Sequence, residues 1–434
     1  MGTSSKKACI CNMWYGGNYG GICTALALCK LVESKGYKPT LLCPSNPYGQ
    51  DASFAKELFA SWGIETRDAF HSEEERAALN DEFDTFIVGS DQVWRYEYTG
   101  HLRGYHFFLD FVAPGKKKLA VAASIATEKC NAPSWWIHNA SARLKLFDAI
   151  STREKQSVAT LQEQFGVNAE FILDPVFLCN PDVWEKISTK VPDSGDDYLF
   201  SYVLDATPEK QAIVDRIAAK EKCTISHMTD SVLYSDKAPE LSHWLSKIRH
   251  CKHVVTDSFH GVCFALIFNK PFTCIANHDR GFLRFSSILE TCDLMSRILE
   301  PNATAVEIDA MPDINWNTAN ALLKNESGKS LTWIETALSA PPDRERINRE
   351  LVQFQIYQLE RHLEIAEAGD LKQLVCAAIM LPYLKKKYRI LQIRTLFSFG
   401  KKRIRYKEEQ RKIKLILRKA RQAHHTIQRY LLNI

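Results

Sequence analysis

The feature that most constrains the fold is a regular alternation of short apolar runs with stretches of helical periodicity. An apolar run at residues 8–13 is followed by a glycine-rich turn, a helix-like stretch and a second apolar run at residues 39–43. The alternation then continues through apolar runs at residues 83–88, 119–124, 147–151 and 169–173. Strands that alternate with helices predict an α/β fold in which a parallel sheet is covered by helices on both faces.

A second block with the same alternation follows a polar segment. Residues 188–197 (STKVPDSGDD) collect turn-forming residues and predict a linker. Beyond this linker, the pattern predicts strands that begin near residues 198, 223, 253 and 272, with helices between them. The predicted domains are residues 1–187 and residues 196–340, and a ligand-binding cleft is expected between them.

The last part of the chain has a different composition. Residues 371–434 contain 18 Lys and Arg but only 2 Glu, a formal charge of +16, whereas the first 370 residues carry −11. Residues 341–434 contain no strand candidate, and they are predicted to be a helical region that ends in a basic amphipathic tail. Such a tail suits an anionic membrane surface better than nucleic acid, because it is aliphatic rather than rich in stacking aromatics. A solvated helix that packs on the acidic main body is the alternative.

The chain is predicted to be cytoplasmic, and its tail would place it at the inner face of the plasma membrane. The thirteen cysteines are scattered, as expected of buried thiols in a reducing compartment. The N-terminus lacks a secretory-signal pattern, and no apolar run approaches the roughly 20 residues needed to cross a bilayer. His, Asp and Glu do not cluster at metal-ligand spacing, so we expect no obligatory metal.

The most suggestive motif is TDSFHG at residues 256–261, which lies between a predicted strand and a predicted helix after His260. Ligands of an open parallel sheet bind beyond the carboxyl ends of its strands, where helix N-termini attract anions. A histidine at this position can exchange a proton near neutral pH. The pattern alone is equally typical of a turn in which Asp257 and Ser258 act as caps.

A second junction of this kind contains Asn18, Tyr19, Gly20 and Gly21. Closely spaced glycines allow the backbone to approach a phosphate or a sugar. The spacing matches neither the dinucleotide fingerprint nor a P-loop, so a tight turn without a ligand is the alternative.

Two further junctions carry polar side chains that suit a sugar or an anion. Asp91, Gln92 and Trp94 follow a predicted strand and could hold a sugar by hydrogen bonds and ring stacking, although a turn with Trp94 in the core fits the same pattern. Arg153 opens a predicted helix and could bind a carboxylate or phosphate, or form an ion pair. Asp174 precedes a proline and is predicted to be a structural turn residue.

The ordered set of these motifs resembles the polysaccharide pyruvyl transferase family over residues 7–290. The segments that carry the resemblance are NYGG, FIVGSDQVWR, AASIAT, ISTREK, LDPVF and VVTDSFHGVCFALIFNKPF. The resemblance implies two Rossmann-like domains in a glycosyltransferase-B-like arrangement, followed here by the helical tail. It also implies transfer of the enolpyruvyl carbon of phosphoenolpyruvate to two sugar hydroxyls, with His260 as the acid and no cofactor besides this donor substrate.

One position departs from the family pattern. Members with this chemistry tend to carry an arginine two residues before the histidine, and Ser258 stands there in this chain. The donor site is therefore predicted at Ser258 and Gly261, with a cation supplied by Arg153, Arg280 or Arg284. Plain surface ion pairs are the alternative for the last two. The acceptor is predicted to bind at Asn18, Tyr19, Gly20, Asp91, Gln92 and Trp94.

These features favour a transferase that adds a pyruvyl group to a sugar of a cell-surface polysaccharide or of its lipid-linked precursor. The partners of such an enzyme are a glycan or lipid-linked oligosaccharide and, through residues 371–434, an anionic membrane. Two other functions remain open. One is a nucleotide-sugar glycosyltransferase, which shares the two-domain plan, and the other is a non-catalytic, membrane-associated subunit of a polysaccharide assembly complex.

Overall fold

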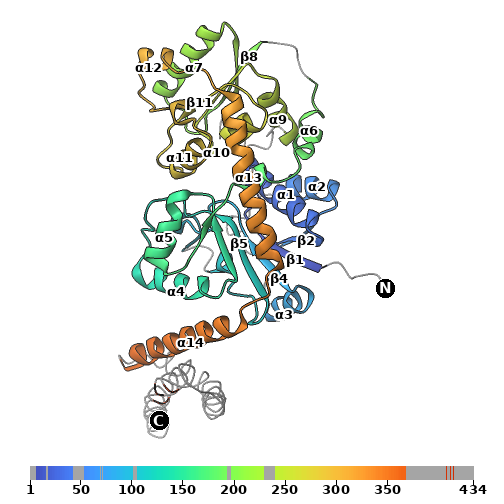
Figure 1. Cartoon of the computed structure of the whole chain (residues 1–434), viewed down its shortest axis with the longest axis vertical. Helices are drawn as coiled ribbons and strands as arrows, with labels where there is room; N and C mark the ends of the chain where they lie inside the picture. The colour runs from blue at the N-terminus through green and yellow to red at the C-terminus, as the bar shows by residue number, and fades with distance from the viewer. Residues whose placement is uncertain are drawn as a thin grey trace, which may run out of the picture. The chain divides into compact units, whose positions relative to one another are not determined.

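The computed structural model describes residues 6–15, 18–42, 53–68, 70, 72–100, 105–192, 197–228 and 240–367, together with 407, 411 and 414. The chain divides into two compact units, Met1–Asp343 and Arg344–Ile434. The first unit contains two parallel sheets, and the segment built on each sheet is called a half below (Figure 1). Whether each half folds as an independent domain stays a prediction.

The first half is built on a parallel sheet with the strand order β3-β2-β1-β4-β5-β6-β7 in the described residues. Its strands are β1 (Lys6–Cys11), β2 (Tyr37–Leu42), β3 (Glu65–Arg67), β4 (Thr85–Val88), β5 (Lys117–Ala123), β6 (Ala149–Thr152) and β7 (Glu170–Phe171). The helices that accompany them are α1 (Tyr19–Ser34), α2 (Ser53–Ser61), α3 (Glu73–Glu82), α4 (Ser134–Leu144) and α5 (Lys155–Phe165), with shorter turns η1 (Tyr96–Gly100), η2 (His106–Phe108) and η3 (Pro175–Phe177). The predicted alternation of strand and helix is confirmed.

The second half repeats this plan with a parallel sheet in the order β12-β11-β10-β8-β9. Its strands are β8 (Tyr198–Tyr202), β9 (Thr224–Met228), β10 (His253–Thr256), β11 (Phe272–Ile275) and β12 (Ile298–Leu299). Its helices are α7 (Pro208–Glu221), α9 (Leu241–His250), α10 (Phe259–Ile267), α11 (Leu283–Thr291), η4 (Met295–Arg297) and α12 (Ala305–Asp309). The central strand β10 is buried along its length, as its run of apolar residues predicts.

The predicted domain boundary at residue 187 falls within a helix that packs against the second half. Helix α6 (Asp182–Ser188) packs against the second half, where the ring of Trp184 lies 4.9 Å from that of Phe264. Arg249 of α9 donates a hydrogen bond of 3.0 Å to the hydroxyl of Ser188. The apolar face of α6 is buried there, so the chain enters the second half at residues 178–181.

The long helix α13 (Trp316–Ser339) returns the chain to the first half (Figure 1). Near its start, Asn320 donates to Asn269 of the second half at 2.8 Å. Farther along, the Ser330 hydroxyl accepts the N–H of Leu173 at 3.0 Å, so α13 is bound to both halves. The ammonium of Lys117 donates to the carbonyl oxygens of Leu338, in the last turn of α13, and of Ala340, just beyond it, and so satisfies carbonyls that a helix terminus leaves unpaired.

The second unit begins with helix α14 (Arg344–Glu367), in agreement with the helical region predicted from residue 341. The basic tail at residues 371–434 lies outside the described residues, apart from Lys407, Arg411 and Lys414, which are helical and exposed. In the described part of the chain, no helix combines the length and the apolar character that a membrane span requires.

Candidate active site

The turn between β10 and α10 forms the centre of the site. The Ser258 hydroxyl accepts the N–H of Gly261 at 3.4 Å, so α10 begins at Phe259, before the predicted start. The Thr256 hydroxyl donates to a β8 carbonyl at 2.6 Å and accepts the N–H of Ser258 at 3.0 Å. A Cβ at Gly261 would lie 2.5 Å from the Thr256 hydroxyl oxygen, so this turn requires glycine. His260 consequently lies in the first turn of α10.

Residues of the first half hold the imidazole of His260. Its Nε2 lies 3.0 Å from the Thr24 hydroxyl oxygen in α1 and 3.8 Å from Oδ2 of Asp174, which follows β7. Gly20 lies against the other ring nitrogen, because an added Cβ there would be 2.0 Å from Nδ1. The His260 residue is only 6% exposed. These contacts bring the carboxyl ends of the two sheets together, where open α/β sheets bind ligands.

Asp174 is the common acceptor of a buried network. Its Oδ2 accepts hydrogen bonds from the Arg153 guanidinium and from the Ser90 hydroxyl, the latter at 3.1 Å. Its Oδ1 accepts from the Thr24 hydroxyl at 3.5 Å. The guanidinium also binds Oδ1 of Asp91 at 2.9 Å. Because buried charges need partners, Arg153 and its two carboxylates stabilise one another.

The charges of this network shift the pKa values of its members in opposite directions. Burial acts to raise the pKa of Asp174, but the positive charge of Arg153 outweighs burial and holds it well below the usual range. The pKa of Asp91 is lowered by the same balance of burial against Arg153. Burial likewise opposes the charged form of Arg153, yet both carboxylates raise its pKa above the ordinary arginine value. All three groups are therefore ionised at neutral pH.

The two arginines of the DRGFLRF segment have different surroundings. Arg280 forms a two-point ion pair with Asp205 at 2.6 and 2.8 Å. An ion pair was the alternative that the sequence left open for Arg280. Arg284, at the start of α11, is 6% exposed and donates to the carbonyl oxygens of Arg280 and Gly281. No carboxylate of the described residues lies within 4.0 Å of its guanidinium. Arg284 is thus a buried cation without a direct anionic partner among the residues that the structure describes.

Arg284 lies beside the Asp174 network. The guanidinium carbons of Arg153 and Arg284 are 4.8 and 5.2 Å from the ring centroid of Phe259. Burial, followed by repulsion from Arg153, lowers the pKa of Arg284 to about 10. The group remains charged at neutral pH, so an anion that binds here would relieve its unfavourable environment.

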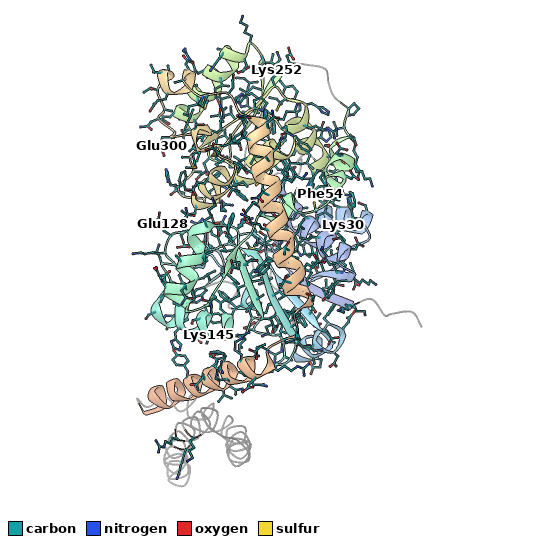
Figure 2. All side chains as sticks on the ribbon, in the orientation of Figure 1. Lys30, Phe54, Glu128, Lys145, Lys252 and Glu300 are labelled. Atoms are coloured by element: carbon teal, nitrogen blue, oxygen red, sulfur yellow. The ribbon has the colours of Figure 1, made fainter. Side chains whose placement is uncertain are left out.

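Two residues of the predicted acceptor site have structural partners. Asn18 caps α1, since its side-chain oxygen accepts the N–H of Gly21 at 3.1 Å. Tyr19 is 2% exposed, and its ring centroid lies 5.7 Å from that of Trp244 and 6.5 Å from that of Phe54. Phe54 is the residue of α2 that is labelled in Figure 2. Asn18 and Tyr19 precede Thr24 by six and five residues.

The junction after β4 contributes to the network mainly through Asp91. Its backbone φ of +74° is in the left-handed region, which aspartate tolerates better than most residues. The Gln92 side-chain oxygen accepts from Arg95 at 2.9 Å. Trp94 donates to the Phe107 carbonyl at 2.9 Å and is 2% exposed, so it lies in the core, as in the alternative interpretation of this motif.

Sequence reasoning missed two residues of the site, Thr24 and Asp174. Thr24 lies inside the buried helix α1, where nothing in the local pattern distinguishes it from a packing residue. Asp174 does cap the 3₁₀ turn η3, as predicted, but the same carboxylate binds Arg153 and lies beside His260. Asp174 is a polar residue that directly follows a predicted strand, and the strand before it in the sequence leads into Arg153. This position was the signal from which its role in the site could have been predicted.

A cavity of about 320 Å³ lies at the amino ends of the strands of the second sheet, near the start of β10. Its lining includes His253, Arg297 and Trp316. The Arg297 guanidinium donates to the carbonyl oxygens of Phe272 and Pro312, so it links loops at this edge. This cavity and His260 lie at opposite ends of β10, and the cavity is not part of the site.

The arrangement of the two halves is shared with proteins of known structure. A UDP-GlcNAc 2-epimerase from Neisseria meningitidis bound to UDP-GlcNAc is 10% identical, with a TM-score of 0.50 over 77% of this chain and 99% of its own. UGT2 of Phytolacca americana, complexed with UDP-2fluoro-glucose and pterostilbene, is 12% identical, with a TM-score of 0.47 over 77% and 100%. The likeness to the epimerase and the two parallel sheets bear out the predicted glycosyltransferase-B-like fold. No curated protein matches it.

The family is identified by the sequence of the two halves. The family model described as polysaccharide pyruvyl transferase matches residues 18–279, more than half of the 434 residues. The matched segment runs from the cap of α1 to the loop after β11, and it contains Arg153, Asp174 and His260. The protein is thus a transferase, and it belongs to the polysaccharide pyruvyl transferase family.

Proposed function

We propose that the protein transfers the pyruvyl group of phosphoenolpyruvate to two hydroxyls of a sugar in a cell-surface polysaccharide or its lipid-linked precursor. Membership of the family supports the reaction class and implies a glycan acceptor. The observation that carries the donor assignment is Arg284, a buried cation with no carboxylate within 4.0 Å among the described residues. An anionic donor would supply the missing partner, and phosphoenolpyruvate carries both a carboxylate and a phosphate.

The proposed reaction needs one proton donor and two hydroxyl groups. His260 gives a proton to the methylene carbon of the donor, which becomes a methyl group while positive charge develops on the adjacent carbon. The two sugar oxygens bond to that carbon, and its C–O bond to phosphate breaks. One hydroxyl proton restores His260 and the other leaves with phosphate, so the transfer is balanced. Arg284 would stabilise the negative charge on the departing phosphate.

Replacing Arg284 by glutamine should raise the KM for phosphoenolpyruvate by about 10- to 100-fold. A hydrogen bond to a charged group contributes about 1.5–3 kcal/mol, and each 1.4 kcal/mol is a factor of ten in binding. The fold should persist, because no ion pair within 4.0 Å is broken among the described residues. The measurement is phosphate release at varied phosphoenolpyruvate with a fixed amount of lipid-linked glycan extract.

The matched control is Arg216→Gln, which removes an arginine from a surface ion pair with Asp309. This variant should keep the wild-type KM. If Arg280→Gln raises the KM while Arg284→Gln does not, the donor instead binds at the ion pair of Arg280 with Asp205.

Product analysis separates this function from the other two. With phosphoenolpyruvate, each turnover should add the mass of one pyruvyl group to the acceptor and release one phosphate from the donor. Turnover with a sugar nucleotide and none with phosphoenolpyruvate would identify a glycosyltransferase. A non-catalytic subunit would give no turnover with either donor.

The basic tail is proposed to hold the enzyme on an anionic membrane that carries lipid-linked acceptors. Each Lys or Arg near such a surface contributes about 1 kcal/mol at most, and the formal charge of residues 371–434 is +16. The full chain should sediment with phosphatidylserine vesicles but not with phosphatidylcholine vesicles, and binding should weaken as salt rises. A chain that ends at residue 370 should stay in the supernatant. Equal sedimentation of both chains would contradict this proposal.

A further inference from the structure

The hydrogen bonds around His260 determine which of its ring nitrogens carries a proton. Asp174 is ionised, because Arg153 holds the pKa of its carboxyl well below the usual range despite burial. An ionised carboxylate only accepts hydrogen bonds. The Thr24 hydroxyl has one hydrogen, and it donates that hydrogen to Oδ1 of Asp174 at 3.5 Å. With that hydrogen directed at Asp174, its oxygen can accept from Nε2 of His260 at 3.0 Å.

A second contact supports the same assignment. Nε2 lies 3.8 Å from Oδ2 of Asp174, so this nitrogen faces a carboxylate as well as the Thr24 hydroxyl. A lone pair on Nε2 would be repelled by that negative charge, whereas an N–H is attracted. Both contacts therefore place a proton on Nε2.

We infer that Thr24 and Asp174 are positioning residues that fix His260 as the Nε2–H tautomer, so that Nδ1 is the nitrogen that exchanges a proton with the substrate. The assignment of Nδ1 to the transfer step rests on the proposed function, whereas the tautomer rests on the contacts alone. In the forward direction, the doubly protonated ring gives the Nδ1 proton to the methylene carbon of the donor. The neutral Nδ1 then accepts one hydroxyl proton, and Nε2 keeps its proton throughout.

Gly20 allows the imidazole to lie directly against α1, because it carries no side chain toward Nδ1. A Cβ at residue 20 would lie 2.0 Å from Nδ1 and would occupy the space beside the reacting nitrogen. Nδ1 forms no hydrogen bond within the described residues, in contrast to Nε2. The charged groups that face the ring are Asp174 and Asp91, and Arg153 is bound to both of these carboxylates.

The test is the nitrogen-15 NMR spectrum of the free protein labelled at histidine, recorded above the pH at which the ring becomes neutral. The His260 signals are assigned by their absence in His260→Gln. We expect a protonated Nε2 and an unprotonated Nδ1 in the wild type. Thr24→Val, which removes the hydroxyl but keeps the shape, should give a mixture of tautomers, whereas Thr24→Ser should keep the wild-type pattern. A wild-type ring protonated at Nδ1, or an unchanged pattern in Thr24→Val, would overturn the inference.

Kinetics supply a second readout. Thr24→Val should lower kcat about tenfold with KM within about twofold, because the tautomer matters for proton transfer rather than for donor binding. Thr24→Ser should recover most of this loss. Thr85→Val removes a hydroxyl from a buried threonine of β4 and should leave both parameters unchanged. The NMR spectrum is recorded without substrate. If the donor is not phosphoenolpyruvate, the kinetic assay shows no turnover, but the NMR spectrum still reports the tautomer of His260.

Discussion

Replacing His260 by glutamine should lower kcat for pyruvyl transfer by about 10²- to 10⁴-fold, the usual contribution of a positioned general acid. Glutamine can still donate to the Thr24 hydroxyl, which lies 3.0 Å from Nε2 in the wild type, but it cannot protonate carbon. The KM for phosphoenolpyruvate should change little, because donor binding is assigned to arginines. Phosphate release and the mass of the glycan product measure both parameters.

The control for this variant is a second histidine outside the site. His278→Gln replaces an exposed imidazole that pairs with Glu300 at 3.2 Å, and it should retain wild-type kcat. Full activity of His260→Gln would contradict the acid role and would leave His260 as a buried turn residue. If complementation of a polysaccharide defect persisted in His260→Gln but failed on loss of residues 371–434, the non-catalytic subunit would be the better description.

Replacing Arg153 by methionine should destabilise the first unit by about 3–5 kcal/mol, in addition to abolishing activity. Breaking a buried ion pair by removing one partner leaves an uncompensated charge, and here two carboxylates, Asp91 and Asp174, lose their cation. Urea denaturation at neutral pH, followed by intrinsic fluorescence, measures the change. Arg216→Met breaks a solvent-exposed ion pair and should shift the midpoint very little. A midpoint in Arg153→Met equal to that of wild type would contradict the proposed balance of charges.

The destabilisation should depend on pH in a defined direction. The folded-state pKa values of Asp91 and Asp174 are lowered, so in the wild type they contribute stability that is fully present above the unfolded value of about 3.9. This contribution is lost as the pH falls through the lower, folded-state values. Without Arg153, burial alone would raise both pKa values, and the carboxyls would become neutral more readily. The difference between wild type and Arg153→Met should therefore be largest at neutral pH and should narrow below about pH 4.

The sequence predicted most of the strands, including the edge strands β7 and β9, but missed the edge strands β3 and β12. The apolar run before the TDSFHG motif is the central strand β10, buried on both faces, so its composition alone identifies it. The edge strands β3 and β12 escaped prediction because they contain only three and two residues, and the residues of β3 are Glu, Thr and Arg. Their pairing with β2 and β11 is determined by neighbouring strands rather than by local propensity.

The junctions of the site were predictable, but their partners were not. His260 and Arg153 each follow a strand, and the general rule for parallel sheets places such residues at a ligand-binding edge. The contact of His260 with Thr24 joins positions 236 residues apart, and no pattern within either helix specifies it. Arg280 and Arg284 lie in one short segment and were equal candidates in the sequence. They differ in the structure because Asp205, which pairs with Arg280, comes from the loop after β8.

The return of α13 to the first half limits the number of ways in which the halves can move. The chain passes between the two halves at residues 178–181 and again along α13. Two bodies that are joined at two points can still rotate about the line that connects these points, but other relative motions are restricted. His260 and Arg284 would travel with one body, and Thr24, Asp174 and Arg153 with the other. This one rotation would thus separate His260 from Thr24 and Asp174. It would also separate Arg284 from Arg153.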